Sequence, residues 1–538
     1  MNRNITVALA SLGLLLGTAG CNSFLTGEKL SSDPNNPAKA TIETLFSGIQ
    51  GAQFAFQEGT VPMMVCMWVQ QCGATNGRFV EQAGRYVFGA GSNIGANGGD
   101  WATVYAAGGL IDMDTIAILA RVAKDDVYLG IDLVWKGFTV GSAADLWGSI
   151  PYSELRTSTT PKLDSQLVVY DTVQAMLTRA IVALNSGVKS LAAPPDLVFG
   201  ADPASWIATA HTLKARYFLH TVEAAVNGKL GARTVTDVWN DVIAEANSGI
   251  SSAAGDFRAF HSGVSYPQSN MWFQFQDNSA FGGDLESGKA LVDYMNNRKD
   301  PRRADYFCPL SDGSWTKTTA YAVDDQVGDP NSNLQQVTTA GTSGATEPTW
   351  NTTVGGTTTD GTATWTNEGP NYAGDDFNAG AGPTGISTFG CEPLRFTGDF
   401  GVPYVTYQEN QLILAEANLA LGNTAAAQTN LQNAYDAVPL TGYTASAIPA
   451  AALLDSIMME KYVVMFQNIE VLSDYRRTCI PTLTPVTPNV LSLNAVPGEL
   501  FYPQTERNAN ANIPPESQEV NAKVRTQSDV SACPTAYP

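Results

Sequence analysis

The sequence has few basic residues and few charges of either sign. Lys and Arg number 30 against 51 Asp and Glu, the formal net charge is −21, and charged residues make up only 15% of the chain. Binding to phosphates needs a basic surface, so this balance argues against nucleic acid as a partner. The uncharged polar residues that replace the charges favour a protein that works outside the cytoplasm and contacts neutral ligands.

Sequence motifs of the common enzyme and cofactor sites are also missing. The chain contains no HExxH, GxSxG, GxGxxG or GxxxxGK[ST] segment, and these are the patterns that would indicate a zinc protease, a serine hydrolase or a nucleotide site. His211 and His220 are expected on opposite faces of one helix, so we interpret them as structural residues. A glycosidase-type carboxylate pair has no spacing that one sequence would identify. We therefore predict a protein that is not an enzyme and holds no cofactor or metal.

The N-terminus has the features of an export signal. Arg3 is followed by the apolar run Ile5 to Leu16 and by the small residues Gly17 to Gly20, directly before Cys21. The apolar run is too short to cross about 30 Å of hydrocarbon. Cleavage before a cysteine resembles the bacterial lipoprotein signal, which predicts that Cys21 is acylated and held in a membrane. The alternative is a secreted protein whose first cysteine forms a disulfide.

Six further cysteines remain after Cys21, an even number that favours disulfides in an exported chain. Their spacing suggests three pairs among the 15 connectivities that six cysteines allow. A zinc site is the alternative, but the chain has no CxxC segment. The suggested pairs are Cys66–Cys72 around the loop CMWVQQC, Cys308–Cys391 around an unusual segment, and Cys479–Cys533 by elimination.

Helical periodicity dominates the chain from about Thr41. Apolar residues recur at helical spacing in 110–122, 168–184 and 206–222. The segment VTYQENQLILAEANLALGN followed by TAAAQTNLQNAYDAV predicts two helices joined at Gly422-Asn423, with Thr424 as the cap of the second helix. This unit predicts a tetratricopeptide-like hairpin, and a third helix is expected over 448–467.

The segment from Ser311 to about Tyr372 has a different composition. It is rich in Thr, Gly and Val, contains few helix formers, and has turn residues every few positions, which predicts short β-strands. We expect a small β module inserted in a helical protein. The predicted organisation is a signal peptide (1–20), a flexible tether (21–40), a helical domain (41–311 and 371–538) and the module (312–370).

Exposed aromatic rings beside amide and hydroxyl groups are typical of sugar-binding sites, because sugar rings present apolar faces and polar edges. Loops provide such groups more readily than helices, and core packing is an equally good explanation for any single aromatic residue. Trp101, Trp135, Trp147, Trp206 and Trp239 lie in or beside helical patterns and are assigned to the core. The ligand-binding candidates, taken from two predicted loops, are Trp68, Arg78, Tyr266, Asn270, Trp272 and Phe275.

Several segments together resemble the SusD/RagB family of outer-membrane nutrient-binding lipoproteins. DLWGSIPYSEL, from Asp145 to Leu155, is similar to the family segment D-x-W-G-D-[IV]-P-Y-[ST]-E-A, with Ser149 and Leu155 as departures. Four other segments resemble family motifs. They are WIATAHTLKARYFLH, TYQENQLILAEANLALG, MMEKYVVMFQNIEVLSDYRRT and FYPQTERNAN.

The resemblance implies a mostly α-helical, SusD-like fold built on tetratricopeptide-like hairpins, with long loops that carry the ligand site. It implies a protein on the cell exterior, lipid-anchored in the outer membrane, that delivers oligosaccharide or peptide to a SusC-like TonB-dependent transporter. The matched motifs belong to the scaffold of the family. They imply structural roles in buried ion pairs for Glu409, Glu416, Glu460, Asp474, Arg476 and Arg477.

The β module is similar to small modules of chitin-binding domains and phage tail proteins. Its three tryptophans, Trp315, Trp350 and Trp365, form either a second sugar-binding platform or the core of the module itself. We expect a glycan-binding protein of the uptake type. The alternatives are a peptide-binding member of the same family and a structural or adhesive surface protein that acts through the module.

Overall fold

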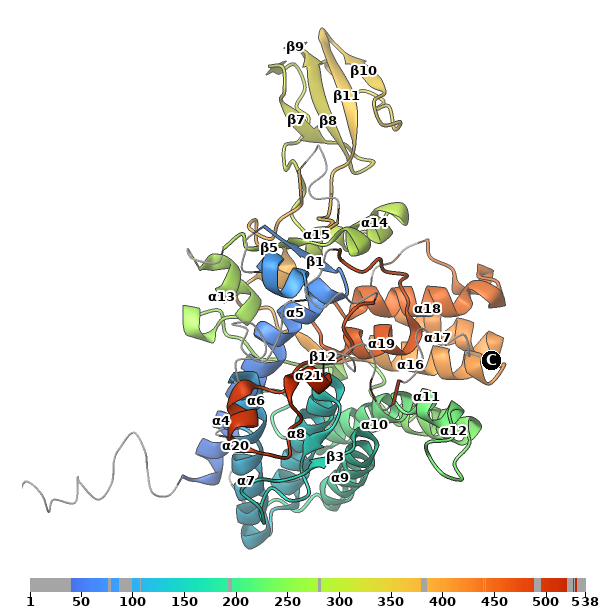
Figure 1. Cartoon of the computed structure of the whole chain (residues 1–538). Coiled ribbons are helices and arrows are strands. Elements are labelled where there is room, and N and C mark those ends of the chain that lie inside the picture. The colour runs from blue at the N-terminus through green and yellow to red at the C-terminus, as the bar shows by residue number, and fades with distance from the viewer. Residues whose placement is uncertain are drawn as a thin grey trace, which may run out of the picture.

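The computed structural model describes residues 40–75, 79–86, 99–106, 108–191, 196–278, 282–378, 385–438, 440, 442–487, 495–519, 526, 528 and 529. Most described elements are helices, which form a broad body, and strands gather in one projection from that body (Figure 1). The fold is therefore mostly α, as the sequence predicts.

The helices of the first half are α4 (Ile42–Glu58), α5 (Thr60–Trp68), α6 (Gly99–Tyr105), α7 (Leu110–Ala123), α8 (Asp126–Trp147), α9 (Gln166–Ser186), α10 (Pro203–Leu219), α11 (Val222–Val226), α12 (Val235–Ala246) and α13 (Met271–Asp277). The later helices are α14 (Lys289–Asn297), α15 (Arg303–Tyr306), α16 (Tyr407–Ala420), α17 (Thr424–Asp436), α18 (Ala450–Val464), α19 (Glu470–Thr478), α20 (Gln504–Ala509) and α21 (Glu516–Glu519). Short single-turn helices lie at Phe79–Gly84, Ala253–Gly255, Tyr266–Gln268, Leu394–Phe396 and Ala445–Ala447.

The long helices pack in sequence as an array of hairpins. Helix α8 contacts α7 and α9, α9 contacts α10, α10 contacts α12, and α12 contacts α16. Helix α16 in turn contacts α17 and α18. The predicted hairpin is α16–α17, although Thr424 is the first residue of α17 and does not cap it, because Asn423 occupies the cap position. The predicted helix 206–222 is divided, since α10 ends at Leu219 and α11 follows.

Two glycines allow α8 and α9 to approach closely. A Cβ atom at Gly130 would lie 2.5 Å from Leu184, and one at Gly137 would lie 2.8 Å from Leu177. Glycine inside a helix lowers stability by roughly 0.5–1 kcal/mol relative to alanine. The close packing of leucine side chains against the α8 backbone offsets this loss by burying apolar surface.

The five tryptophans assigned to the core are all buried. Trp135 packs edge-on against Phe257 with ring centroids 4.9 Å apart, and Phe257 also contacts Trp206 at 5.3 Å. These contacts join α8, α10 and the short strand β4 (Phe257–Arg258). The strand pairs with β12 (Pro403–Val405), which leads into α16. The segment that follows Phe257 is therefore attached directly to the packed core.

Buried ion pairs tie the helical hairpins together. Both oxygens of Glu409 on α16 accept hydrogen bonds of 2.6 Å from Arg216 on α10. Glu416 on the same helix pairs with Arg477 of α19. Because a buried charge without a partner is strongly unfavourable, each pair fixes how two helices meet.

The other charged residues of the family motifs have similar partners. Glu460 pairs with Arg302 at 2.7 Å, Lys461 with Asp474 at 2.7 Å, and Arg476 with Asp529 at 2.7 Å. All of these side chains are almost fully buried. The structural role expected for the six motif residues is thus confirmed.

Three small two-stranded sheets lie within the helical body or beside it. They pair β1 (Cys72–Ala74) with β5 (Leu285–Ser287), β2 (Ile150–Pro151) with β3 (Leu163–Asp164), and β4 with β12. Two disulfides, Cys66–Cys72 and Cys308–Cys391, form as the spacing suggests. Cys479 is also disulfide-bonded, whereas Cys533 and Cys21 lie outside the described residues.

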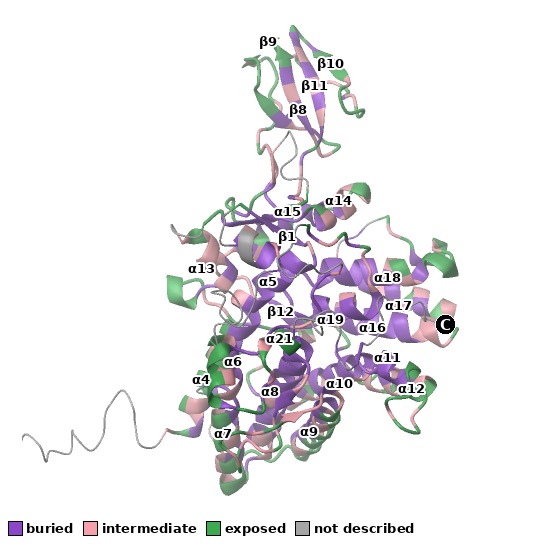
Figure 2. Cartoon of the chain, viewed as in Figure 1, coloured by how far each residue is buried: buried purple, intermediate pink, exposed green. Residues whose placement is uncertain are grey.

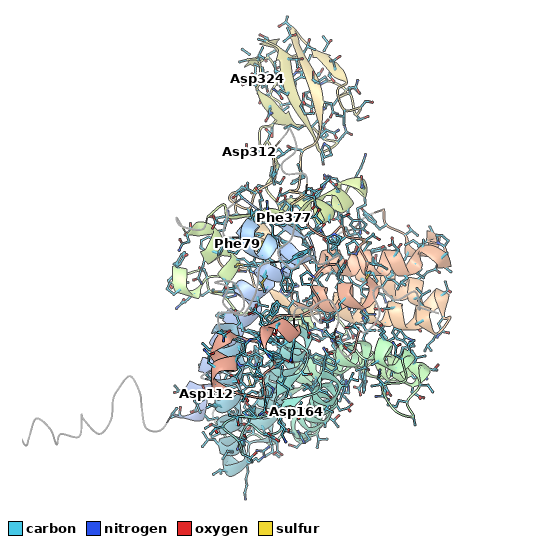
Figure 3. The ribbon with its side chains drawn as sticks, viewed as in Figure 1. Phe79, Asp112, Asp164, Asp312, Asp324 and Phe377 are labelled. Carbon is cyan, nitrogen blue, oxygen red and sulfur yellow. A yellow bond between two sulfur atoms is a disulfide. The ribbon has the colours of Figure 1, made fainter. Side chains whose placement is uncertain are left out.

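Six strands fall inside the range predicted as a β module. They are β6 (Ala320–Tyr321), β7 (Gln326–Gly328), β8 (Asn333–Thr339), β9 (Gly341–Thr342), β10 (Thr357–Asp360) and β11 (Ala363–Pro370). Four of them form an antiparallel sheet in the order β10-β11-β8-β7. Asp312 lies at the neck where the strands leave the helical body, and Asp324 lies within the projecting part (Figure 3).

Within the described part of the chain, two helical stretches, Gly99–Ala123 and Gln166–Ser186, are long and apolar enough to cross a membrane by length and composition. The second is α9, which carries Asp171 and Arg179 and buries Val169, Val173 and Leu177 against its neighbours. Its packing between α8 and α10 accounts for the apolar residues. We therefore treat α9 as a core helix of the array.

Candidate functional site

The segment from Phe257 to Asp277 builds the candidate site. After β4 the chain turns outward, forms a single helical turn at Tyr266–Gln268, and enters α13. The sequence predicted a loop here without helical periodicity, and α13 corrects that prediction. Asn270 caps the helix by accepting a hydrogen bond of 2.7 Å from the backbone of Trp272, and a helix this short buries too few residues to show a period.

Two adjacent depressions lie along this segment. The first, of about 410 Å³, is lined by Gly51, Phe54 and Ala55 of α4, by Leu197, and by residues between Phe260 and Gln274. The second, of about 590 Å³, is lined by residues between Ser262 and Asp277 and by residues between Glu392 and Asp399. Ser262 and Ser269 line both. We refer to the two depressions together as the Phe260–Tyr266 site.

Two aromatic side chains stand out at this site. Phe260 is 50% exposed and Tyr266 is 41% exposed, and no other aromatic side chain among the described residues is as exposed. Phe260 lines the first depression and Tyr266 lines the second. The surrounding part of the chain near α13 is mostly exposed or half-buried (Figure 2). Rings in this position offer apolar faces to a ligand.

Hydrogen bonds within the segment hold its shape. The hydroxyl of Ser262 donates to the side-chain oxygen of Gln268 (2.6 Å), and the amide of Gln274 donates to the carbonyl of Ser269 (2.6 Å). The hydroxyl of Tyr266 donates to the carbonyl of Gln274, which fixes the orientation of its ring. The segment is therefore preorganised, which reduces the entropy lost when a ligand binds.

A buried carboxylate anchors the segment to α4. Glu58, at the end of α4, lies with its two oxygens 3.0 and 2.9 Å from Nε2 of His261. It also accepts hydrogen bonds from the hydroxyl of Tyr404 (2.7 Å) and from the backbone of Met271 (3.3 Å). Burial, together with the charge of Glu58, raises the pKa of Tyr404 well above its ordinary value, so Tyr404 remains a donor. One carboxylate thus joins two points of the site-forming segment, His261 and Met271, to the core.

The charge at the site is negative. Asp277, Glu392 and Asp399 are exposed and line the second depression. No lysine or arginine is among the described residues that line either depression. The remaining polar groups are hydroxyls and amides, which both donate and accept hydrogen bonds.

Three of the predicted ligand-binding residues are buried. Trp68 is 0% exposed and belongs to α5 rather than to a loop, and Trp272 is 1% exposed, packed against Phe396 and Phe466. Asn270 uses its side chain to cap α13 and to donate to Phe400 (2.8 Å). None of these side chains has a free surface for a sugar, so these predictions are corrected in favour of core packing.

The other candidates have mixed outcomes. Tyr266 lies at the site, as proposed from its loop context. Phe275 is half-buried and packs edge-on against Phe79, which is labelled in Figure 3, at a centroid distance of 5.3 Å. Arg78 lies outside the described residues. The sequence reasoning missed Phe260, because a single phenylalanine after a short strand gives no periodic signal that would distinguish it from the core.

The tryptophans of the β module form its core. Trp365 and Trp350 are buried and contact each other edge-on at 5.4 Å, with Val327 and Val337 in the same cluster. Trp315 is half-buried and donates from Nε1 to Asp360 (2.7 Å). Of the two interpretations of these tryptophans, the core of the module is therefore confirmed for Trp350 and Trp365, and the sugar-binding platform is wrong for them.

One group of described residues has the spacing of metal ligands, namely Asp145, His220 and Glu470, all buried. His220 lies 2.8 Å from each carboxylate. Burial opposes protonation of this imidazole, but the two negative charges outweigh it and raise the pKa of His220 to about 10. A protonated His220 already occupies the space between the two carboxylates, and Arg216 lies 3.7 Å from Glu470 as a further cation, so the arrangement does not fit a metal. His211 pairs with Glu245 (2.6 Å) and is likewise structural.

An array of helical hairpins with aromatic and polar depressions on its surface is an arrangement suited to ligand binding. Residues 34–351 match the family model of SusD-like proteins, described as starch-binding and associating with the outer membrane. The chain belongs to the SusD-like family. SusD-like proteins bind their ligands without catalysis.

Solved structures share the fold over most of the chain. A chitin-binding protein is 19% identical, with a TM-score of 0.63 over 91% of this chain and 98% of its own. A chitin-binding SusD homolog from Flavobacterium johnsoniae is 16% identical, with a TM-score of 0.62 over 91% and 99%. A SusD/RagB family protein from Bacteroides thetaiotaomicron is 18% identical, with a TM-score of 0.59 over 90% and 97%. No curated protein sequence is significantly similar to the chain.

Proposed function

We propose that the protein binds an oligosaccharide at the Phe260–Tyr266 site and delivers it to a SusC-like TonB-dependent transporter. Its family associates with the outer membrane and binds nutrients of the starch type. To these family properties the proposal adds three points. They are the location of the binding site, the transporter as partner and a position on the exterior face of the outer membrane.

The observation that carries the proposal is the placement of the two most exposed described aromatic side chains. Phe260 and Tyr266 each line one of two adjacent depressions that share Ser262 and Ser269. A sugar ring would stack its apolar face on each aromatic ring, while Gln268, Gln274 and the serines bond to its hydroxyls. Two stacking positions in adjacent depressions suit a chain of sugar units better than a single sugar.

The solved relatives suggest which saccharide to test first. Two of the structures with the same fold are of chitin-binding proteins. At 16–19% identity these comparisons support the fold and not the ligand, so the N-acetylglucosamine oligomer enters as the first saccharide to test. Starch-type oligosaccharides follow from the description of the family.

The anchor and the partner complete the proposal. Acylation of Cys21 would hold the protein at the membrane, since each buried CH₂ of a lipid chain contributes about 0.8 kcal/mol. The polar stretch from Asn22 to Lys39 would act as a tether between lipid and helical body. Replacing Cys21 by serine is then expected to release the protein from the membrane fraction.

The test is a glycan array with soluble protein that begins at Asn22, run beside a peptide array. The proposal expects binding to a defined set of neutral or amino oligosaccharides and none to peptides. Binding to peptides only would replace the proposal by the peptide-binding alternative. A second protein that lacks residues 312–370 is expected to bind the same saccharides, and loss of binding in it alone would favour the adhesive alternative.

A further inference from the structure

The lining of the Phe260–Tyr266 site carries negative charge. Asp277, Glu392 and Asp399 reach the second depression from two separate parts of the chain, α13 and the segment after Cys391. Among the described residues that line the two depressions, His261 is the one basic residue. Nε2 of its imidazole lies 2.9 Å from a carboxylate oxygen of Glu58. A ligand in the second depression therefore meets three carboxylates and no lysine or arginine among the described residues that line it.

The arginines nearest along the chain do not supply that compensation. Arg258 pairs with Asp256 at 2.8 Å, and Arg395 donates to the carbonyl of Phe466 at 3.0 Å with its guanidinium over the ring of Tyr306. Neither lines the depressions. Both guanidinium groups are engaged by protein groups outside the site.

Two of the three carboxylates are available to a ligand. Asp277 and Glu392 are exposed, and their side chains have no ion pair or hydrogen bond within the described part of the chain. Asp399 accepts one hydrogen bond, of 2.9 Å, from the hydroxyl of Thr397. Gly263, whose Cβ position would lie 3.1 Å from the Cβ atom of Asp399, brings the backbone of the Tyr266 segment against this acidic edge.

We infer that the site selects glycans that carry free amino groups, namely oligosaccharides of unacetylated hexosamine units. This inference rests on the proposed function and names its substrate class. The sugar rings stack on Phe260 and Tyr266, and the protonated amines bond to Asp277, Glu392 and Asp399. Hydrogen bonds between charged partners are roughly twice as strong as neutral ones. Acetylation removes the charge of the amine, and a uronic acid replaces attraction by repulsion.

The experiment compares three oligosaccharides of equal length by calorimetric titration at pH 5.5, namely glucosamine, N-acetylglucosamine and galacturonic acid hexamers. The glucosamine hexamer is expected to bind at least tenfold more tightly than the acetylated one, with an affinity that falls as salt rises. The galacturonic acid hexamer is expected not to bind.

A charge variant and its control identify the groups responsible. The triple variant D277N/E392Q/D399N is expected to bind the two hexosamine oligomers equally. The control D305N/D312N/D455N removes the same number of negative charges at exposed positions outside the two depressions and is expected to keep the preference. A control that also loses the preference would show an effect of net charge alone and overturn the inference.

The possible results separate this inference from the proposed function. If the acetylated hexamer binds as tightly as the glucosamine hexamer, or if the galacturonic acid hexamer binds, the selectivity is refuted while glycan binding stands. If a lysine-rich peptide binds more tightly than any saccharide, the carboxylates serve a peptide and both statements fail. If no saccharide binds, both also fail.

Discussion

His261 and Glu58 join the candidate site to the core, with Nε2 of the imidazole 2.9 Å from the carboxylate. The carboxylate is fully buried at the end of α4, and His261 directly follows the exposed Phe260. The backbone that carries the exposed ring of Phe260 is therefore held in place by the contact between His261 and the buried Glu58. Ligand-binding groups on such a support keep their geometry in the free protein, which favours affinity.

Replacing Glu58 by alanine should disturb both stability and binding. His261, Tyr404 and the backbone of Met271 would lose their common acceptor, and each buried donor left without an acceptor costs about 1–3 kcal/mol. We expect a clear fall in the free energy of unfolding and at least a tenfold loss of glycan affinity. The control is E245Q, which weakens the ion pairs of Glu245 with His211 and Lys214 at a position that lines neither depression and should leave glycan affinity unchanged. Equal effects of the two variants on affinity would contradict the anchoring role.

Replacing Glu416 by alanine should destabilise the helical array without changing the site. Arg477 would lose the Glu416 carboxylate and keep its ion pair with Asp474 at 2.9 Å, and breaking a buried ion pair by removing one partner costs up to about 3–5 kcal/mol. Chemical denaturation should show the loss, while glycan affinity measured below the transition should stay within twofold of the wild type. A large change in affinity in the folded variant would mean that this ion pair also shapes the site.

The pH dependence of stability should contain a contribution from Glu286. Burial, with a further contribution from Asp375, raises the pKa of its carboxyl from 4.5 to about 7. The folded state thus holds the proton more tightly than the unfolded chain. The stabilisation is fully present below about pH 4.5 and is lost as pH rises through about 7.

The variant E286Q, which resembles the protonated form, tests this contribution. Its melting temperature should exceed that of the wild type by roughly 1–3 °C at pH 8, and the two should agree near pH 4.5. The control is D293N, on the exposed side of α14, where Asp293 pairs with Lys289. A pH-independent difference between E286Q and the wild type would refute the raised pKa.

Replacing Trp365 by alanine should unfold the β module alone. The side chain is fully buried and contacts Trp350 and Tyr321 at centroid distances of 5.4 and 4.8 Å. Losing a buried tryptophan costs about 3–5 kcal/mol, a large share of the stability of a small module. Limited proteolysis should then cut within 312–370 and leave the remainder intact. The affinity for glycan should be unchanged, and its loss would assign ligand binding to the module.

The sequence predicted the scaffold well because the scaffold leaves periodic signals. Helices α7 and α9 follow stripes of apolar residues, and the hairpin α16–α17 is visible from the Gly422 turn, where φ is +79°. The charged residues of the family motifs form the expected buried pairs. The change in composition near Ser311 located the strands of the module.

The candidate site was only partly predictable. Tyr266 was found from its loop context, but Trp272, six residues later, is buried by Phe396 and Phe466, which are far away in the sequence. Trp68 was expected in a loop because two cysteines enclose it, whereas the disulfide begins inside α5. Burial of one aromatic and exposure of another depend on tertiary contacts, and a local pattern does not contain them.

The central claim, that glycan binds at the Phe260–Tyr266 site, is tested most directly by titrating the hexosamine oligomers into the F260A/Y266A double variant. Both side chains are exposed, and the hydrogen bond that the variant removes, from Tyr266 to the carbonyl of Gln274, lies within the exposed segment, so the helical body should stay folded, with at most a small fall in melting temperature. The control I118A removes an exposed apolar side chain on α7. We predict at least a 30-fold loss of affinity in the double variant and none in the control, since a stacked ring is worth about 0.5–1.5 kcal/mol beyond its buried area. Unchanged affinity in a folded double variant would contradict the claim.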